Sequence, residues 1–583
     1  MSFYNNSKVS DILKKMAFLC ELEAENPFKV RAYYKAADAI DMLVKDLSEM
    51  SDDELLEING IGKGMLSHIR DIIAKGSFDE YVALSKKYPA TIFELSEIGG
   101  LGPKRIKILY EKLAIDTKEK LYRAAKNGDI AKLDGFGEKI EKKIIESIER
   151  NEITSKRFLI SKAQFNAANI VDFIKKLGYK KVEYAGSLRR GKETVGDIDV
   201  VVAGDPSAAS KIAKYPGVLK VVAEGPTKVS FILSDSMQCD VRIVSEESFG
   251  AALCYFTGSK EHNIALREIA AGKGYTLNEY GLFRKGSKKP IASRTEHEIY
   301  KALGLSYIPP ELRENQGEIE LAQKNMIPKL VELSDIKGEI HCHTDMTDGN
   351  MSLEEIVDYL SQIYEWFFIG DHSYPLRFVK GLDYKAYISS REKLISIRDK
   401  YPKVSFDRSI ELEILKDGSL AFEDSELENV SLVISAAHTL TKMKRDDMTS
   451  RMIKAISNPY CDVVAHLSQR LIFQRDEVDM DYDLVFEKAK EFNTIFEVNG
   501  QPDRLDLKDV NIKKVKGMGL KVVLSSDAHS KEQFSYIEYA VKIARRAWLT
   551  KDDVLNTYSF KDFVEFIKEK RDYRKKLKSK TNG

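Results

Sequence analysis

The chain has 583 residues, 43% of them hydrophobic, which is enough for roughly four or five domains with well-formed cores. Its 92 Lys and Arg residues balance 91 Asp and Glu residues, so the net charge of +1 excludes a uniformly basic nucleic-acid coat but not local basic patches. No apolar run approaches the length of a membrane span, and the five cysteines form no CxxC pair. We therefore expect a cytoplasmic protein with neither a membrane partner nor a structural zinc knuckle.

An internal repeat organises residues 1–155, whose hydrophobic pattern predicts helices throughout. Each copy has an apolar residue, a Gly-x-Gly turn and a helical segment, and the glycine pairs are Gly60 and Gly62, Gly100 and Gly102, and Gly135 and Gly137. The pattern resembles the helix-hairpin-helix, whose glycines let a DNA phosphate approach backbone N–H groups at a helix N-terminus. One copy alone is more often a plain helix–helix turn, but three copies favour DNA-backbone binding without sequence readout. We expect one copy in a domain of residues 1–75 and two copies in a second helical domain, 76–155.

A predicted strand opened by two aspartates organises the next region. Asp197 and Asp199 introduce the apolar run 200–202, and residues two apart on a strand project from the same face. The alternating run 239–244 predicts a neighbouring strand with a third outward carboxylate, Asp240. Three such carboxylates suit a site for two Mg²⁺ or Mn²⁺ ions. The turn before the first strand offers N–H groups and an arginine fork to a triphosphate, through Gly186, Ser187, Arg190 and Gly196.

These motifs and the following run Tyr255-Phe256-Thr257-Gly258-Ser259 resemble the family X DNA polymerases of the polymerase β type. The resemblance implies a nucleotidyltransferase palm at 156–245, a helical thumb at 246–315, and catalytic metal ligation by Asp197, Asp199 and Asp240. It assigns the nucleotide pocket to Gly186, Ser187, Arg190, Gly196, Tyr255, Phe256, Gly258, Asn263 and Arg267. Core aromatics are the plainer interpretation of the Tyr-Phe pair. Other nucleotidyltransferases share the first motif but are not expected to carry the Tyr-Phe-Thr-Gly-Ser run.

Residues 1–75 resemble the small amino-terminal domain of the same family through the run 26–37. In the family this domain holds the 5′-phosphate side of a DNA gap, and the resemblance assigns that contact to Lys29, Tyr33 and Lys35. A solvated helix face is the plainer interpretation. Polymerase β also uses a lysine of this domain to remove a deoxyribose phosphate. Here His68 occupies that position and cannot form the Schiff base, so we expect no such lyase activity unless Lys63 or Lys35 takes the place of that lysine.

The last part of the chain follows a Pro-Pro break at 309–310 and a charged linker, 316–335. In residues 336–575, seven short apolar runs lead to polar groups, and helical segments separate most of them. Strands that end in reactive or metal-binding side chains, with helices between the strands, predict a parallel α/β barrel. The barrel is expected to be distorted because it has seven strands instead of eight. The whole chain is therefore expected to combine α+β and α/β domains. Imidazole and carboxylate groups at the strand ends favour Zn²⁺, Mn²⁺ or Fe.

This region resembles the PHP (polymerase and histidinol phosphatase) domain, which bacterial and archaeal family X polymerases carry at the carboxyl end. The resemblance implies three metal ions held by nine ligands, here His341, His343, Asp348, His372, Glu411, His438, His466, Asp527 and His529. The chain departs from the usual pattern at Gly370, Ser409 and Leu467, where the family usually has Thr, Gly and Pro. Arg470 and Arg504 are candidates for phosphate contact.

Together these resemblances imply a DNA polymerase that fills short gaps in DNA repair, with a barrel that acts as a metal-dependent 3′-5′ exonuclease. Cleavage at abasic sites and removal of 3′-phosphates are further activities that they allow. A structural or regulatory barrel is the alternative, and a small-molecule phosphatase on a DNA-binding arm is a third hypothesis. We expect a monomer that binds gapped or primed DNA and dNTPs. The basic run 568–580 predicts a solvated, disordered tail, with a phosphate-backbone contact as the alternative.

Overall fold

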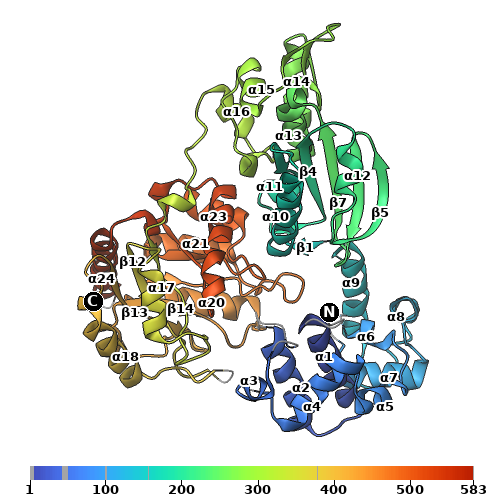
Figure 1. Cartoon of the computed structure of the whole chain (residues 1–583). Helices are drawn as coiled ribbons and strands as arrows, with labels where there is room; N and C mark the ends of the chain where they lie inside the picture. The colour runs from blue at the N-terminus through green and yellow to red at the C-terminus, as the bar shows by residue number, and fades with distance from the viewer. Residues whose placement is uncertain are drawn as a thin grey trace. The chain divides into compact units, whose positions relative to one another are not determined.

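The computed structural model describes residues 6–41, 47, 50–58, 60–96, 98, 101–154, 157–376 and 379–581. The chain divides into two compact units, residues 1–155 and 156–583 (Figure 1). Among the described residues, no helix combines the length and apolar character that a bilayer crossing requires.

The first unit is built from helices, as predicted. They are α1 (Asn6–Leu22), α2 (Pro27–Asp41), α3 (Asp52–Leu56), α4 (Lys63–Lys75), α5 (Asp79–Ser85), α6 (Ile92–Leu95), α7 (Pro103–Leu113), α8 (Lys118–Lys126) and α9 (Glu138–Thr154). Buried residues recur at helical spacing, as in Ile69 and Ile72 of α4 and Ile106 and Leu109 of α7, and they join one core. Helices α4, α7 and α9 each begin directly after the second glycine of a repeat copy. The repeat therefore sets three helix starts.

The second unit begins with a five-stranded sheet in the order β2-β4-β7-β6-β5, in which β4 and β7 are parallel neighbours. The elements of this part are β1 (Phe158–Leu159), α10 (Ile160–Lys176), β2 (Val182–Tyr184), α11 (Gly186–Arg189), β3 (Thr194–Val195), β4 (Asp197–Ala203), α12 (Ala208–Ile212), β5 (Val218–Gly225), β6 (Lys228–Leu233) and β7 (Gln238–Val244). Ile198, Val200 and Val202 of β4 pack with α10 and α12. Val201, on the opposite face of the same strand, packs with Ala252 and Leu253 of α13 (Phe249–Thr257).

A mixed helical segment follows. It contains α13 (Phe249–Thr257), α14 (Lys260–Gly272), the antiparallel strands β8 (Tyr275–Asn278), β9 (Gly281–Arg284) and β10 (Pro290–Ala292), α15 (Glu296–Ala302) and α16 (Glu318–Gln323). The predicted linker, 316–335, is partly folded into this segment, because Ile319, Ala322 and Leu330 are buried in its core. Its Glu318 is fully buried and lies 2.7 Å from His262 Nδ1.

Seven parallel strands in sequential order form the last part of the chain, which confirms the predicted distorted barrel (Figure 1). The strands are β11 (Gly338–Glu339), β12 (Trp366–Ile369), β13 (Ser405–Glu413), β14 (Leu432–Ala436), β15 (Val463–Val464), β16 (Ile495–Asn499) and β17 (Val522–Ser525). Helices α17 (Leu353–Leu360), α18 (Tyr384–Ser396), α19 (Asp424–Leu427), α20 (Arg445–Ile456), α21 (Tyr482–Glu491), α22 (Asp509–Gly517) and α23 (Ile537–Arg546) lie between or after them. A bridge between Cys342 and Ala528 joins the segments that follow the first and last strands.

The basic run 568–580 is not a disordered tail, which corrects that prediction. It belongs to α24 (Phe560–Thr581). Phe563 and Ile567 of this helix pack in one cluster with residues of the barrel strands, including Trp366 and Ile495, the first residues of β12 and β16. Arg574 is only 1% exposed, and its guanidinium donates to the Asn458 and Cys461 carbonyls. The helix thus covers the amino-terminal end of the barrel, opposite the strand ends that carry the histidines. The run of positive charges predicted a solvated segment, but buried backbone carbonyls accept hydrogen bonds from its cationic side chains and so allow the segment to pack as a helix.

Candidate functional sites

Three carboxylates lie together at one edge of the five-stranded sheet. Asp199 of β4 and Asp240 of β7 are register partners, and Asp197 is two residues before Asp199 on the same face. Burial, together with the charges of Asp197 and Asp240, raises the pKa of Asp199 to about 7. Lys228 lies 2.6 Å from Asp240 and, with Ser230 and Gln238, lowers the pKa of Asp240 against the effect of burial. Crowded carboxylates of this kind are suited to divalent cations.

The predicted phosphate turn is packed directly against these carboxylates. Gly186 has φ +62°, and a Cβ built there would lie 2.5 Å from Asp199 Oδ2, so the position requires glycine. Ser187 follows it in the single helical turn α11, and Gly196 precedes β4. Arg190 ends the turn, and its Nε donates to Glu314 Oε1 at 3.1 Å. The other arginine of the motif, Arg189, instead forms a bidentate pair with Glu296.

Several residues of the predicted nucleotide pocket are neighbours in space. Tyr255, Asn263 and Arg267 line one small pocket, and Asn263 donates its side-chain amide to the Tyr255 carbonyl at 2.7 Å. Tyr255 is 37% exposed, which argues against the plainer interpretation of a core aromatic. Phe256 lies against it edge-on and beneath the Arg242 guanidinium, 4.8 Å from the ring centre. Gly258 caps α13 with φ +67° and is close to Arg190, because a Cβ there would lie 3.1 Å from Arg190 Nη1.

The glycines of the helix-hairpin-helix repeat leave open space at helix starts. Gly62 and Gly102 are the N-cap residues of α4 and α7 and make no side-chain cap. A Cβ at Gly62, Gly102, Gly135 or Gly137 would meet no atom within 4 Å. Gly60 has φ +110° and packs on Lys35. Gly100 lies outside the described residues. This open space leaves room for a phosphate near the first N–H groups of these helices, and DNA contact remains a prediction.

Of the three predicted 5′-phosphate contacts, Tyr33 requires a correction. Its side chain is only 3% exposed, and its hydroxyl donates to Glu80 at 3.0 Å and lies 3.2 Å from His68 Nδ1. Phe78 stacks on His68 with ring centres 4.2 Å apart. Lys29 pairs with both Glu25 and Glu80, so two carboxylates already balance its charge. Sequence spacing alone could not reveal Glu80, which lies 51 residues from Lys29.

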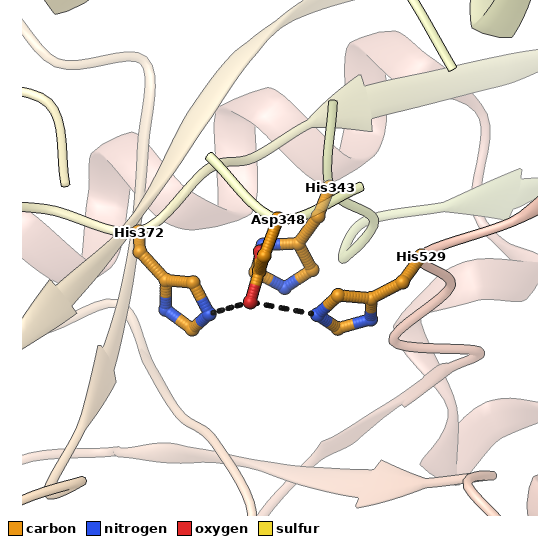
Figure 2. A group of neighbouring side chains, drawn as sticks. All are labelled: His343, Asp348, His372 and His529. Carbon is orange, nitrogen blue, oxygen red and sulfur yellow. Dashed lines mark ion pairs between the residues drawn. The ribbon is translucent and has the colours of Figure 1, made fainter. Parts of the chain in front are cut away.

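All nine predicted metal ligands of the barrel meet at the carboxyl ends of the strands. Eight of them form three overlapping groups in which potential ligand atoms lie within 4.8 Å of one another: His343, Asp348, His372 and His529; His341, His343 and Asp527; and His372, Glu411 and His438. In Figure 2, Asp348 lies between His372 and His529, at 3.3 Å and 3.5 Å from their Nε2 atoms. His466 joins the third group through a 2.8 Å contact with Glu411. Asp348, rather than the nearby Asp345, belongs to the cluster.

The chemistry of this cluster fits cations. Glu411 is 1% exposed, and three histidines lie within 3.0 Å of its oxygens: His372, His438 and His466. Burial and the neighbouring His529 and His372 lower the pKa of His343 to about 4, and its buried Nδ1 has no hydrogen-bond partner among the described residues. A buried imidazole that stays neutral and has an unsatisfied nitrogen is a suitable metal donor.

The role of outer carboxylates in orienting these histidines was not predicted from the sequence. Glu497 accepts at 2.6 Å from His341 Nδ1, and Glu413 lies 2.9 Å from His438 Nδ1. Asp371, fully buried, pairs with Arg408 and accepts from Thr344 and Thr347. Carboxylates placed like Glu497 and Glu413 fix the ring orientation and tautomer of metal-binding histidines, whereas the recorded partners of Asp371 are not histidines. The available signal was that Glu413 lies two residues after the predicted ligand Glu411 in β13, and that Glu497 lies near the end of the apolar strand β16.

The two arginines predicted to contact phosphate differ in their surroundings. Arg470 is 4% exposed and pairs with Glu193 at 2.7 Å, so it joins the barrel to the β4 sheet region rather than facing the cluster. Arg504 lies 4.0 Å from Asp527, one of the predicted ligands, whereas a buried Nε without a hydrogen-bond partner among the described residues is common to both arginines. Arg504 is therefore the better candidate of the two.

Two departures from the PHP pattern are neighbours in space. A Cβ at Gly370 would lie 2.7 Å from the Ser409 hydroxyl oxygen, which donates to the Ile340 carbonyl. The missing side chain at 370 is thus matched by the added side chain at 409. The pair preserves the packing beneath Asp371 and His372.

We expect Gly370→Ala to destabilise the protein by roughly 1–3 kcal/mol, because the new methyl group overlaps Ser409. Adding Ser409→Gly should recover most of this loss, which thermal unfolding of both single variants and the double variant would measure. A neutral Gly370→Ala variant, or a double variant no more stable than Gly370→Ala, would contradict the compensation.

Comparisons with known proteins agree with this architecture. Residues 4–78 match the helix-hairpin-helix domain, 92–150 the SAM-like helix-hairpin-helix tandem, and 252–314 the DNA polymerase beta thumb. The chain is 34% identical to the DNA polymerase/3′-5′ exonuclease PolX of Bacillus subtilis, over 96% of this chain and 98% of the relative. It is 30% identical to a probable phosphatase of Thermoanaerobacter sp., over 30% of this chain and 72% of the relative. DNA polymerase lambda of Arabidopsis thaliana is 24% identical over 53% of this chain and 62% of that relative.

Proposed function

Because the chain belongs to the PolX family of DNA polymerase/3′-5′ exonucleases, we propose that it fills short DNA gaps with its first site and trims 3′ ends with its barrel. The observation that carries this proposal is that one chain holds two sets of potential metal donors. The first is the carboxylate set Asp197, Asp199 and Asp240, and the second is a cluster of eight residues at the barrel end that His466 joins through Glu411. Gapped or primed DNA and dNTPs are the proposed substrates, and repair is the proposed context.

In the first site, Asp197, Asp199 and Asp240 would hold Mg²⁺ or Mn²⁺, and bound cations would offset the charge of the triphosphate. Ser187, Arg190 and the N–H groups of the Gly186 turn would hold the outer phosphates. Tyr255 would press against the sugar and disfavour a 2′-hydroxyl. Asn263 and Arg267, four residues apart on α14, would face the minor-groove edges of the new base pair.

In the barrel, the nine cluster residues would hold three ions, with Mn²⁺, Zn²⁺ and Fe as candidates. Bound ions would polarise the scissile phosphate. Glu497 and Glu413 would keep His341 and His438 in the donor tautomer, and Arg504 would contact the phosphate. The intact donor set favours an active barrel over the purely structural alternative.

The test uses a gapped duplex whose primer is labelled at its 5′ end, incubated with Mn²⁺ and without nucleotides. We expect wild type and Asp199→Ala to shorten the primer, while His341→Ala leaves it intact. With Mg²⁺ and dNTPs, His341→Ala should extend the primer and Asp199→Ala should not. If His341→Ala shortens the primer as fast as wild type, the barrel is not the nuclease.

A further inference from the structure

The segment that carries the phosphate turn is in contact with the barrel. Arg546, the last residue of α23, donates through Nη1 to the Arg190 carbonyl at 2.8 Å and to Glu314 Oε1 at 3.0 Å. Its Nε and Nη2 are held by Asp509, the first residue of α22, at 2.8 Å and 2.7 Å. Arg546 therefore connects the two parts of the second unit at the residue predicted to bind triphosphate.

The contact is close and shielded from solvent. The side chains of Arg190, Glu314 and Arg546 are 13%, 14% and 5% exposed. Gly191 has φ +70°, and a Cβ there would lie 3.5 Å from Arg546 Cδ. Buried, charge-assisted hydrogen bonds are stronger and less screened by salt than surface pairs.

Arg546 competes with Arg190 for the same carboxylate oxygen of Glu314, so the pair between Glu314 and Arg190 is weaker than it would be alone. Glu314 Oε1 is shared by three cations, because Arg190, Lys192 and Arg546 all lie within 3.2 Å of it. If Glu314 were paired with Arg190 alone, its negative charge would neutralise the positive charge of Arg190. Because Glu314 is shared by three cations, it orients the Arg190 guanidinium while the group as a whole stays positively charged and attracts phosphate. The bond to the Arg190 carbonyl fixes the backbone at the end of the same turn.

We propose that Arg546 of the barrel is a positioning residue for the polymerase reaction, because it holds Arg190 ready for the nucleotide triphosphate. The inference rests on the proposed function, in which Arg190 binds that triphosphate. It also gives the barrel a role in nucleotide binding that is separate from its own metal cluster.

The experiment measures single-nucleotide gap filling by the full chain, with KM for the dNTP and kcat determined separately. We expect Arg546→Ala to raise KM about tenfold with little change in kcat, and Arg546→Lys to recover part of the loss. Asp509→Asn, which only loosens Arg546, should raise KM less. Retained barrel nuclease activity shows that each variant is folded.

The matched control is Arg545→Ala. Arg545 is on the same helix and pairs with Glu311 at 2.7 Å, but none of its recorded contacts is with Arg190 or Glu314. An unchanged KM for this variant separates positioning of Arg190 from general docking of the two parts. The inference is overturned if Arg546→Ala leaves KM unchanged, or if Arg545→Ala raises it equally. If Arg190→Ala also leaves KM unchanged, the assigned role of Arg190 in the proposed function fails as well.

Discussion

Replacing Asp199 with Asn is expected to lower gap-filling activity about a thousandfold, which corresponds to ~4 kcal/mol of transition-state stabilisation. Asn keeps the shape of the side chain but removes the charge that would attract the catalytic cations. Because the side chain packs against Gly186 and beside Asp240, no neighbouring carboxylate can move into its place. Single-turnover extension of a gapped primer measures the loss.

The same variant should be more stable than wild type in EDTA at pH 8. The pKa of Asp199 is raised to about 7 in the folded chain, whereas an unfolded aspartate titrates near pH 4. The folded state thus favours the protonated group, and this favourable contribution is complete below pH 4 and is lost as the pH rises through 7. Asn never ionises, so its advantage should grow from pH 4 to 7, to on the order of 2–4 kcal/mol.

Thermal unfolding at pH 5 and pH 8 would measure this difference. Asp172→Asn is the control, because its side chain on α10 is 61% exposed and far from the carboxylate set in sequence. We expect that control to change neither activity nor stability. Gap filling within tenfold of wild type, or a stability gain that does not depend on pH, would contradict the assignment of Asp199.

Local patterns were sufficient to predict much of the fold and the carboxylate-bearing face of the first site. Alternation along β4 and β7 predicts which face carries Asp199 and Asp240, because strand periodicity is local. The glycine repeat predicts the starts of α4, α7 and α9. Short apolar runs predicted that polar groups gather at one end of the barrel, because all parallel strands in a barrel end on one side, whereas the nine ligands themselves were named from the resemblance to the PHP domain.

Features that depend on distant partners could not be predicted. Arg546 meets Arg190 across 356 residues, and Arg470 meets Glu193 across 277 residues. A sequence window contains only one member of each pair. The basic run of α24 and the aromatic Tyr33 were misassigned for the same reason, since their buried partners are the Cys461 carbonyl and Glu80. Pattern analysis identifies a charged residue but not what will neutralise it.

The second large effect concerns Glu411, the carboxylate shared by the histidines of the barrel. We expect Glu411→Gln to lower the 3′-5′ nuclease rate by at least about a hundredfold, since one substitution alters the surroundings of His372, His438 and His466 together. Gap filling should stay within about twofold of wild type, because Glu411 makes no recorded contact with the palm. Metal content of the purified variant should fall in parallel with the nuclease rate.

Glu497→Gln provides a graded comparison. Glu497 contacts one histidine side chain, His341, and accepts from the His466 backbone, so its loss disturbs orientation rather than the shared carboxylate. We expect a smaller decrease of about tenfold, and an intermediate metal content. If Glu411→Gln keeps both its metal and its nuclease rate, the cluster does not hold the catalytic ions. If it loses metal while the nuclease rate persists, strand cleavage belongs elsewhere in the chain.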